Sequence, residues 1–351
     1  MAKYPKGMRK VLDPSKVKAK GIKTNDPNAF LLGSLLKASP QFISGNYLAE
    51  KLKMSRVGIW SRIDKLRKSG LLIEACQNRG YRLAGEPNTL VRPLLEAWFK
   101  ECKLEYPFHL LDRVDSTNSE AERLLASGHK APFIVLSHQQ EKGRGRMGRK
   151  WHSPKGGNLY LSIALQPNVE LVKFRNFTLW QGVSIGKFLQ KHTGVEDLRV
   201  KWPNDLILNN KKLAGMLTEA SIDCDQVRSI VFGFGLNINS TIKQFPNDLQ
   251  NISTSLKEET GMEWRIHELA AKIVRVSIKA SKECMKEDSG EKLLQQWEEM
   301  DFLKGQKVTI QSGKDQFSGK ANGIDASGAL ILQARNGKRK AVNSGEVSLQ
   351  K

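Results

Sequence analysis

A short loop between two apolar, β-rich segments concentrates glycine and arginine. Residues 143–149 read Gly-Arg-Gly-Arg-Met-Gly-Arg, and Trp151 follows two positions later. Glycine lets a backbone approach a ligand closely, and arginine carries forked donors that suit phosphate or carboxylate oxygens. The loop lacks the Gly-Lys-Ser/Thr of a Walker loop, and no helical pattern follows it as a dinucleotide fingerprint requires. The pattern predicts a lid that orders over a ligand, with a flexible, RNA-binding basic segment as the alternative.

A second polar group follows at residues 201–205, which read Lys-Trp-Pro-Asn-Asp, and at Lys212. Asn204 and Asp205 would present an amide and a carboxylate where a strand ends, beside a proline of fixed φ. A turn at 209–211 would bring Asp205 and Lys212 together, because residues equidistant from a hairpin turn face each other. An Asp–Lys contact of this kind is more often a surface ion pair than a catalytic couple.

The segment from 88 to 300, which carries both groups, mixes strands and helices. Consecutive strands without helical crossovers between them favour a largely antiparallel or mixed α+β sheet over a doubly wound one. A Thr117/Glu120 pattern predicts a capping box that starts a helix running to Ala126. The other predicted helices are 177–190, 264–285 and 292–300, and the predicted strands are 108–114, 133–137, 159–165, 198–201, 206–208, 213–218 and 230–234.

The N-terminal part of the chain shows a different pattern. Apolar residues at helical spacing predict three short helices between 27 and 70, with Ser44 and Ser55 as caps, followed by a hairpin around Gly80. This order is typical of a winged helix-turn-helix, whose third helix faces the DNA major groove. The alternative is a helical bundle with a solvated basic face. The candidate DNA-contacting residues are Ser55, Arg56, Ser61, Arg62, Lys65 and Arg79.

Charge and composition are consistent with a nucleic-acid partner. The net charge is +21, and residues 1–90 hold 18 Lys and Arg against 6 Asp and Glu. The first 26 residues include eight Lys and Arg and are predicted to be a disordered extension. No apolar run approaches the roughly 20 residues of a bilayer span, and the 4 cysteines are far apart. We therefore expect a cytoplasmic protein with reduced thiols and no membrane partner.

The last 50 residues change again, to short strands between glycine-rich turns, which predicts a small β-barrel. The length of 351 residues is itself more than one core usually organises. The expected division is a basic extension at 1–26, a winged helix-turn-helix at 27–87, a catalytic unit at 88–300 and an SH3-like unit at 301–351.

These motifs, in this order and spacing, resemble those of bacterial biotin–protein ligases. The matching set adds Asp115-Ser-Thr-Asn118, Gln140, Lys212-Leu-Ala-Gly215 and Gly233-Phe-Gly-Leu-Asn237 to the two groups above. The N-terminal part, with Met54-Ser-Arg56, resembles that of the bifunctional ligases that also repress biotin operons. The resemblance covers the chain from about Asn28 onward and implies a class II synthetase-like biotin/lipoate ligase fold. Residues 1–26 have no counterpart in it.

The resemblance implies a two-step reaction. The biotin carboxylate attacks the ATP α-phosphate and displaces pyrophosphate, and a lysine amine of an acceptor domain then attacks the mixed anhydride. It implies that Ser116, Thr117 and Gln140 bind the ureido end of biotin, that Lys212 bridges carboxylate and α-phosphoryl oxygens, and that Trp151 stacks with adenine. The glycines at 215, 233 and 235 would form the narrow walls of the biotin slot.

The implied residue sets are larger than these examples. The catalytic set is Lys212, Arg146 and Asp205, where Asp205 orients either the incoming lysine or Mg²⁺. The biotin-binding set is Ser116, Thr117, Asn118, Gln140, Gly143, Arg144, Arg146, Lys212, Gly215, Gly233 and Gly235. The nucleotide-binding set is Arg146, Arg149, Trp151, Asn204, Lys212 and Asn237, and no dedicated metal-ligand cluster is assigned.

The implied partners are ATP, biotin, Mg²⁺, the biotin carboxyl carrier protein of acetyl-CoA carboxylase, operator DNA and, with biotinyl-AMP bound, a second copy of the chain. Two other functions stay open at this point. One is a ligase whose winged helix binds no operator, and the other is a biotin-sensing DNA-binding regulator without transferase activity. An intact Lys212, Arg146 and Asp205 argue against the second.

Overall fold

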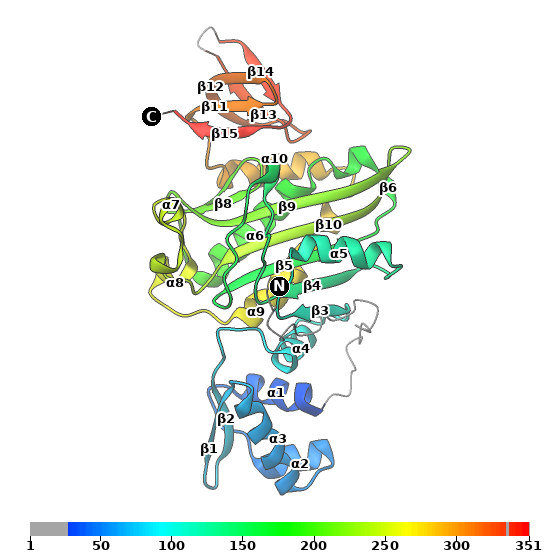
Figure 1. Cartoon of the computed structure of the whole chain (residues 1–351), viewed down its shortest axis with the longest axis vertical. Coiled ribbons are helices and arrows are strands. Elements are labelled where there is room, and N and C mark those ends of the chain that lie inside the picture. The colour runs from blue at the N-terminus through cyan, green and yellow to red at the C-terminus, as the bar shows by residue number, and fades with distance from the viewer. Residues whose placement is uncertain (1–26, 335–336, 351) are drawn as a thin grey trace, which may run out of the picture.

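The computed structural model describes residues 27–334 and 337–350, and the basic segment 1–26, predicted to be disordered, lies outside the described residues. Three helices and a hairpin occupy one end of the elongated molecule (Figure 1). They are α1 (Pro27–Ala38), α2 (Gly45–Leu52), α3 (Arg56–Lys68), β1 (Leu72–Cys76) and β2 (Gly80–Gly85). The expected winged helix-turn-helix is thus confirmed.

Local sequence explains why these helices start and pack as they do. The Ser44 hydroxyl accepts a hydrogen bond from the Asn46 N–H, and the Ser55 hydroxyl accepts one from the Gly58 N–H, so each serine satisfies a free donor of its helix. On α3, Ile59, Ile63 and Leu66 recur at helical spacing and are buried. The opposite face of α3 is left to solvent.

A buried acid–imidazole contact joins this unit to the rest of the chain. The Val91 N–H donates to Nε2 of His267 at 2.7 Å, which leaves the ring proton on Nδ1, 3.1 Å from the Glu86 carboxylate. The other Glu86 oxygen accepts from the indole of Trp98. The side chains of His267 and Glu86 are only 0% and 4% exposed. The link between the two units is therefore held by a desolvated polar cluster.

Around this cluster, two helices pack the N-terminal unit against the centre of the molecule. Helix α4 (Arg92–Glu101) lies between α1 and the long helix α9 (Ile266–Cys284), and it contacts both (Figure 1). Its apolar residues Leu94 and Leu95 recur four positions later as Trp98 and Phe99, so a helical period does mark α4 in the sequence. It was not predicted.

The central unit is a mixed sheet in the strand order β3-β4-β5-β10-β9-β8-β7, with β6 paired to β10. Only β3 and β4 run parallel to each other, so the expected mixed α+β sheet is confirmed. The strands are β3 (Phe108–Leu111), β4 (Phe133–Ser137), β5 (Asn158–Leu165), β6 (Val169–Glu170), β7 (Leu198–Lys201), β8 (Asp205–Leu208), β9 (Lys211–Asp223) and β10 (Gln226–Asn237).

Different helices cover the two faces of this sheet. Along β10, Phe232 faces α6 (Phe177–Thr193), where it contacts Phe177, while the next residue, Gly233, faces Asn118 of α5 (Thr117–Ala126). Helix α9 packs on α6 on that same side. The remaining helices are α7 (Asn247–Gln250), α8 (Leu256–Thr260) and α10 (Ser289–Met300). Within the described ranges, no helix is long and apolar enough to span a bilayer.

Two local predictions were wrong in detail. Thr117 does not cap α5, because its hydroxyl donates to Gln140 across the site, and Ser116 stands at the cap position without a side-chain hydrogen bond. The hairpin of β8 and β9 does not pair Asp205 with Lys212 directly. A register shift after Leu206 places Asp205 opposite Gly215 and Lys212 opposite Ile207, so the two charged residues are diagonal neighbours on one face.

The C-terminal unit is an antiparallel sheet in the order β14-β13-β12-β11-β15, in agreement with the prediction. Its strands are β11 (Lys307–Ser312), β12 (Asp315–Ile324), β13 (Leu330–Gln333), β14 (Arg339–Val342) and β15 (Glu346–Leu349). The Trp202 indole donates to the Gly328 carbonyl, and the Asn176 amide donates to the Ala326 carbonyl. The turn 325–329 is thereby held against the central unit.

Replacing His267 by alanine is expected to lower the free energy of unfolding by about 3 kcal/mol, because it leaves one oxygen of the buried Glu86 carboxylate without its imidazole partner and the Val91 N–H without an acceptor. Denaturant unfolding measures the change. The control is His192→Ala, which removes a more exposed imidazole 3.7 Å from Glu268 and should cost less than about 1 kcal/mol. Equal losses in the two variants would contradict a stabilising role for the buried cluster.

Candidate active site

The glycine–arginine loop folds as a tight hairpin between β4 and β5. The Trp151 N–H donates to the Gly143 carbonyl at 2.8 Å, and the Gly145 N–H donates to the Arg149 carbonyl at 2.7 Å. At the tip, Met147 has φ +53° and Gly148 has φ +74°. A Cβ on Gly143 would lie 2.5 Å from the Trp151 carbonyl oxygen, so only glycine permits this closure. The loop is ordered by its own backbone.

The indole of Trp151, at the end of the loop, packs flat against two strands at positions where both strands have glycine. Gly215 of β9 and Gly235 of β10 face each other in register. A Cβ on Gly235 would lie 2.5 Å from Nε1 of Trp151, and one on Gly215 would lie 3.0 Å from its Cζ3. The indole N–H is buried and has no hydrogen-bond partner among the described residues, which leaves it a donor for a ligand.

Lys212 and Asp205 form an ion pair beside this indole. The Lys212 Nζ lies 2.8 Å from Oδ1 of Asp205 and 5.5 Å from the centre of the Trp151 ring. Oδ1 is buried, and the Lys212 ammonium is the cation that pairs with it. The Lys212 backbone also bonds to Ile252 and Thr254, so the segment before α8 fixes it from a second side.

Further positive charge surrounds the pair. Burial lowers the pKa of Arg146 and of Lys201, and the Asp205 carboxylate opposes the shift in both. From the C-terminal unit, Glu346 of β15 forms an ion pair with Arg149 of the loop. A desolvated cationic site of this kind favours an anionic ligand, because a negative charge restores the lost solvation of the guanidinium and ammonium groups.

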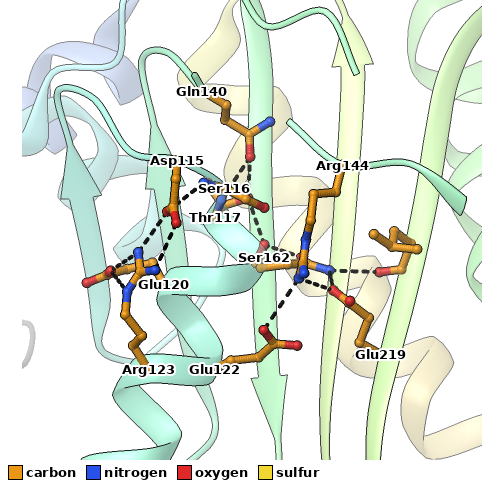
Figure 2. A network of polar contacts seen from close by, with 12 residues as sticks. Asp115, Ser116, Thr117, Glu120, Glu122, Arg123, Gln140, Arg144, Ser162 and Glu219 are labelled. Carbon is orange, nitrogen blue, oxygen red and sulfur yellow. Dashed lines mark hydrogen bonds and ion pairs between the residues drawn. The ribbon is translucent and has the colours of Figure 1, made fainter. Parts of the chain in front are cut away.

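A polar network lies deeper in the site (Figure 2). Gln140 accepts hydrogen bonds from the N–H and the hydroxyl of Thr117 through one oxygen, and its nitrogen donates to Ser153. The Ser162 hydroxyl lies 2.8 Å from the Thr117 hydroxyl and 2.6 Å from the Asn118 amide oxygen. These groups satisfy one another, so a polar ligand must exchange contacts with them.

The network ends on the first arginine of the loop. The Asn118 nitrogen donates to Glu219, which also pairs with Arg144 at 2.7 Å (Figure 2). Glu122 lies 3.4 Å from the same guanidinium, and its pKa is raised by burial and by the neighbouring Glu219 charge. Arg144 is thus held by two carboxylates, away from the Lys212–Asp205 pair.

Almost all of the predicted ligand-binding residues line one cavity of about 550 Å³. These are Ser116, Thr117, Asn118, Gln140, Arg144, Arg146, Arg149, Trp151, Asn204, Asp205, Lys212, Gly215, Gly233, Gly235 and Asn237. Gly143 lies outside the lining and closes the loop instead. A Cβ at 215 or 235 would meet Trp151, and one at 233 would meet Asn118, so each of the three positions leaves space that a side chain would fill.

The sequence matches known families in three consecutive segments. Residues 110–237 match the biotin/lipoate A/B protein ligase family, residues 30–82 an HTH domain, and residues 304–350 the biotin protein ligase C-terminal domain. The chain is 32% identical to the bifunctional ligase/repressor BirA of Bacillus subtilis over 89% of its own length and 95% of that protein. Against BirA of Escherichia coli the identity is 31%, over 90% and 95%.

The chain belongs to the BirA family of bifunctional ligase/repressors. A solved structure agrees with this assignment. The biotin protein ligase from Aquifex aeolicus, in complex with biotin and ATP, superposes with a TM-score of 0.59 at 29% identity, and it covers 70% of this chain and 98% of its own. The three-part architecture is therefore that of the BirA family, with the HTH unit added to a ligase core.

Several residues of the site carry no signal in a single BirA-type sequence. Glu219, Ser162 and Ser153 belong to the polar network, and Glu346 reaches the loop from a strand 197 residues away. Phe245, Leu249 and Ile252 line the cavity from the segment before α8. Only their contacts identify them. Lys201, by contrast, stands inside a motif that the sequence singles out and could have been named.

Two of the predicted nucleotide-binding amides already have partners. The Asn204 nitrogen donates to the Met216 carbonyl, and the Asn237 nitrogen donates to the Thr254 carbonyl. Asn204 therefore holds the turn before β8 against β9, and Asn237 holds the segment that flanks Lys212. Both residues line the cavity, so they also position its walls.

In the winged helix, the predicted DNA-contacting residues separate into two groups. Arg56 and Lys65 are exposed on α3, whereas Arg62 turns inward, where its guanidinium donates to Asn28 and lies beside the Met54 sulfur. Arg79, on the β1–β2 hairpin, stacks 4.6 Å above the Phe42 ring. Ser55 is used as the helix cap, and Ser61 is partly exposed.

Replacing Gly235 by alanine is expected to lower the free energy of unfolding by about 2 kcal/mol, because the new methyl group collides with the Trp151 indole. Denaturant unfolding measures it, and acrylamide quenching of tryptophan emission should increase. Gly33→Ala is the control, since its Cβ meets no atom within 4 Å and alanine favours its helix. If the Gly235→Ala protein were as stable as the Gly33→Ala protein, the close packing of the Trp151 indole on Gly235 would be contradicted.

Proposed function

We propose that this chain is a biotin–protein ligase that makes biotinyl-5′-AMP and transfers biotin to a lysine of a biotin carboxyl carrier protein. The observation that carries the proposal is the ion pair of Lys212 and Asp205, beside Trp151 and under a cationic loop, in a cavity lined by the matching residues. Support comes from family membership and from the Aquifex aeolicus ligase, whose complex holds biotin and ATP.

In the first step, a biotin carboxylate oxygen attacks the α-phosphorus of ATP and pyrophosphate leaves. Lys212 contributes a positive charge where negative charge builds on the phosphoryl oxygens, and Arg146 is a second fixed cation at the same cavity. Because both are partly desolvated, their interaction with the transition state is stronger than in water. The reaction needs positioning and charge stabilisation, without a covalent enzyme intermediate.

In the second step, the lysine amine of the carrier attacks the carbonyl carbon of the mixed anhydride, and AMP leaves. The amine must lose a proton before or during attack. Asp205 is the one carboxylate in contact with Lys212 within the described chain, so it is placed to orient an incoming ammonium or to bind a metal ion. We assign it one of these two positioning roles, as both place a cation at the buried carboxylate that pairs with the Lys212 ammonium.

Magnesium fits this site through Asp205 together with substrate phosphates. In the described part of the chain, no group of three or more His, Cys, Asp or Glu side chains could hold a metal ion. Mg²⁺ does not need such a cage, since it binds through one or two carboxylates plus phosphate oxygens. Bound there, it would neutralise charge on the polyphosphate, while Lys212 and Arg146 act on the α-phosphate.

The polar network supports recognition of the ureido group at the deep end. Gln140, Thr117 and Asn118 offer donors and acceptors close to the buried Ser116. A ureido group carries both N–H donors and a carbonyl acceptor, so it can replace contacts on both sides of this network. The nucleotide end of the cavity has Trp151 for base stacking and Arg149 for phosphate.

We also propose that the chain is a biotin-responsive repressor that acts in the cytoplasm as a homodimer. The family and the HTH unit support DNA binding. The sheet supports pairing, because residues 217–223 of β9 extend beyond β8 and have β10 as their only strand neighbour within the described chain (Figure 1). The four cysteines form no disulfide among the described residues, consistent with a reducing compartment.

Lys212→Ala is expected to reduce biotin-dependent exchange of pyrophosphate into ATP at least about 100-fold, because it removes the charge that stabilises the transition state. Lys211→Ala, one residue away in the turn of the same hairpin, is the control and should retain exchange. Exchange with lipoate but none with biotin would contradict the substrate. Exchange without biotinylation of the carrier would instead favour a sensing regulator that lacks transfer.

A gel-shift titration with DNA from upstream of biotin-synthesis genes should show binding that tightens when biotin and ATP are both present. Light scattering under the same conditions should show the mass of two chains. Identical shifts with and without the ligands, or none in either case, would contradict a ligand-controlled repressor and favour a ligase that binds no operator.

A further inference from the structure

Two large apolar side chains lie exposed on the helix that would face DNA. Val57 and Trp60 of α3 are 73% and 56% exposed, although the opposite face of the same helix is fully buried. Spaced by three residues, they lie next to each other on the helix surface, with Ser61 beside them. Neither contributes to the core of the winged helix, so folding does not explain them.

The surroundings of this pair are cationic. Helix α3 carries Arg56, Arg62, Lys65, Arg67 and Lys68 against the single acid Asp64. Arg62 and Arg67 are used inside the domain, where they donate to Asn28 and to the Ile73 carbonyl. Arg56 and Lys65 remain exposed on either side of the apolar pair. Such a rim is complementary to phosphate and not to an apolar protein surface.

The position of the pair along the helix matches base readout. Val57 and Trp60 belong to the first two turns of α3, and a recognition helix contacts base edges with its N-terminal residues. Phosphate contacts from arginine and lysine hold the helix in register but carry no sequence information. Discrimination between bases must then come from the side chains at the centre of this face.

We propose that Val57 and Trp60 read the 5-methyl groups of thymine in the major groove. Thymine is the only base that presents an apolar group there. A valine and an indole have no charged donor for guanine and no carboxylate for cytosine, so they favour sites with thymine opposite the start of α3. The inference rests on the proposed DNA binding and names the bases that it selects.

The test uses duplex DNA that full-length wild-type protein selects from a random library in the presence of biotin and ATP. The selected duplex is then made with thymidine or with deoxyuridine, which differs by the methyl group alone. Wild-type protein should bind the deoxyuridine duplex about fourfold more weakly for each methyl group that it contacts. Val57→Ala and Trp60→Ala should bind the thymidine duplex more weakly and lose most of this difference.

Two further variants separate this effect from general loss of binding. Lys65→Ala should weaken binding to both duplexes equally and reduce the salt dependence by about one ion. Val172→Ala removes another exposed valine, at 57%, from the central unit and should leave the thymidine preference intact. Retained pyrophosphate exchange in Val57→Ala and Trp60→Ala shows that the rest of the molecule is folded.

The outcomes separate a failure of DNA binding from a failure of thymine readout. If wild-type protein selects no DNA, the repressor half of the proposed function is wrong and this inference falls with it. If it selects DNA but binds both duplexes equally, only the thymine readout is overturned. A Trp60→Ala protein that keeps its thymidine preference but no longer forms dimers would overturn it too, and would assign the exposed indole to contact with a second copy.

Discussion

The site depends on one close approach, that of the Trp151 indole to two strands that lack side chains where it lies. Gly215 and Gly235 must face each other across β9 and β10, because a side chain at either position would push the ring away. That alignment requires the long antiparallel register of β10 with both β5 and β9. The loop hairpin pairs Arg144 with Lys150, so Arg144 and the neighbouring Trp151 both lie at its open end. The sheet register thus determines where the loop charges lie.

A second property follows from how the polar groups are paired. In this structure, Thr117 bonds to Gln140, and Asn118 bonds to Ser162 and Glu219. Arg144 is held by Glu219 and Glu122. The groups expected to bind ligand are therefore already hydrogen-bonded before it arrives. Binding is an exchange of partners, so its net free energy is small for each contact, and selectivity comes from ligands that replace all the contacts at once. An incomplete replacement would leave a buried group unpaired.

Sequence patterns predicted the fold where elements are locally marked. Ser44 and Ser55 cap helices, and periodic apolar residues define α3, α6 and α9. Sequence patterns gave wrong predictions where tertiary contacts determine the local structure. The Thr117 hydroxyl, for example, bonds to Gln140 instead of capping α5. Helix α4 was missed for another reason, because its apolar residues do recur at helical spacing and were not used. The polar ends of β9 and β10 are exposed and look like a turn, so both strands were predicted too short.

The sequence predicts which motifs form the site, but it does not predict most of the contacts between their side chains. Lys212 and Asp205 meet as expected, but through a register shift that places them diagonally. Partners from distant segments, such as Glu346 on Arg149 and Thr254 on Lys212, depend on how the C-terminal unit and the segment before α8 pack. No spacing rule within one sequence reports such contacts, since their partners are separated by loops of unrelated composition.

The buried Glu86–His267 contact has a geometric consequence for a pair of such chains on DNA. The link at 86–91 is anchored to the central unit by these buried contacts, and they fix the point from which the winged helix extends. In a symmetric pair of chains, the distance between the two α3 helices would then be set by how the central sheets pair. For the homodimer proposed above, half-sites one or more whole helical turns apart would suit this distance. Lengthening the spacer by half a turn would put one winged helix on the wrong side of the duplex.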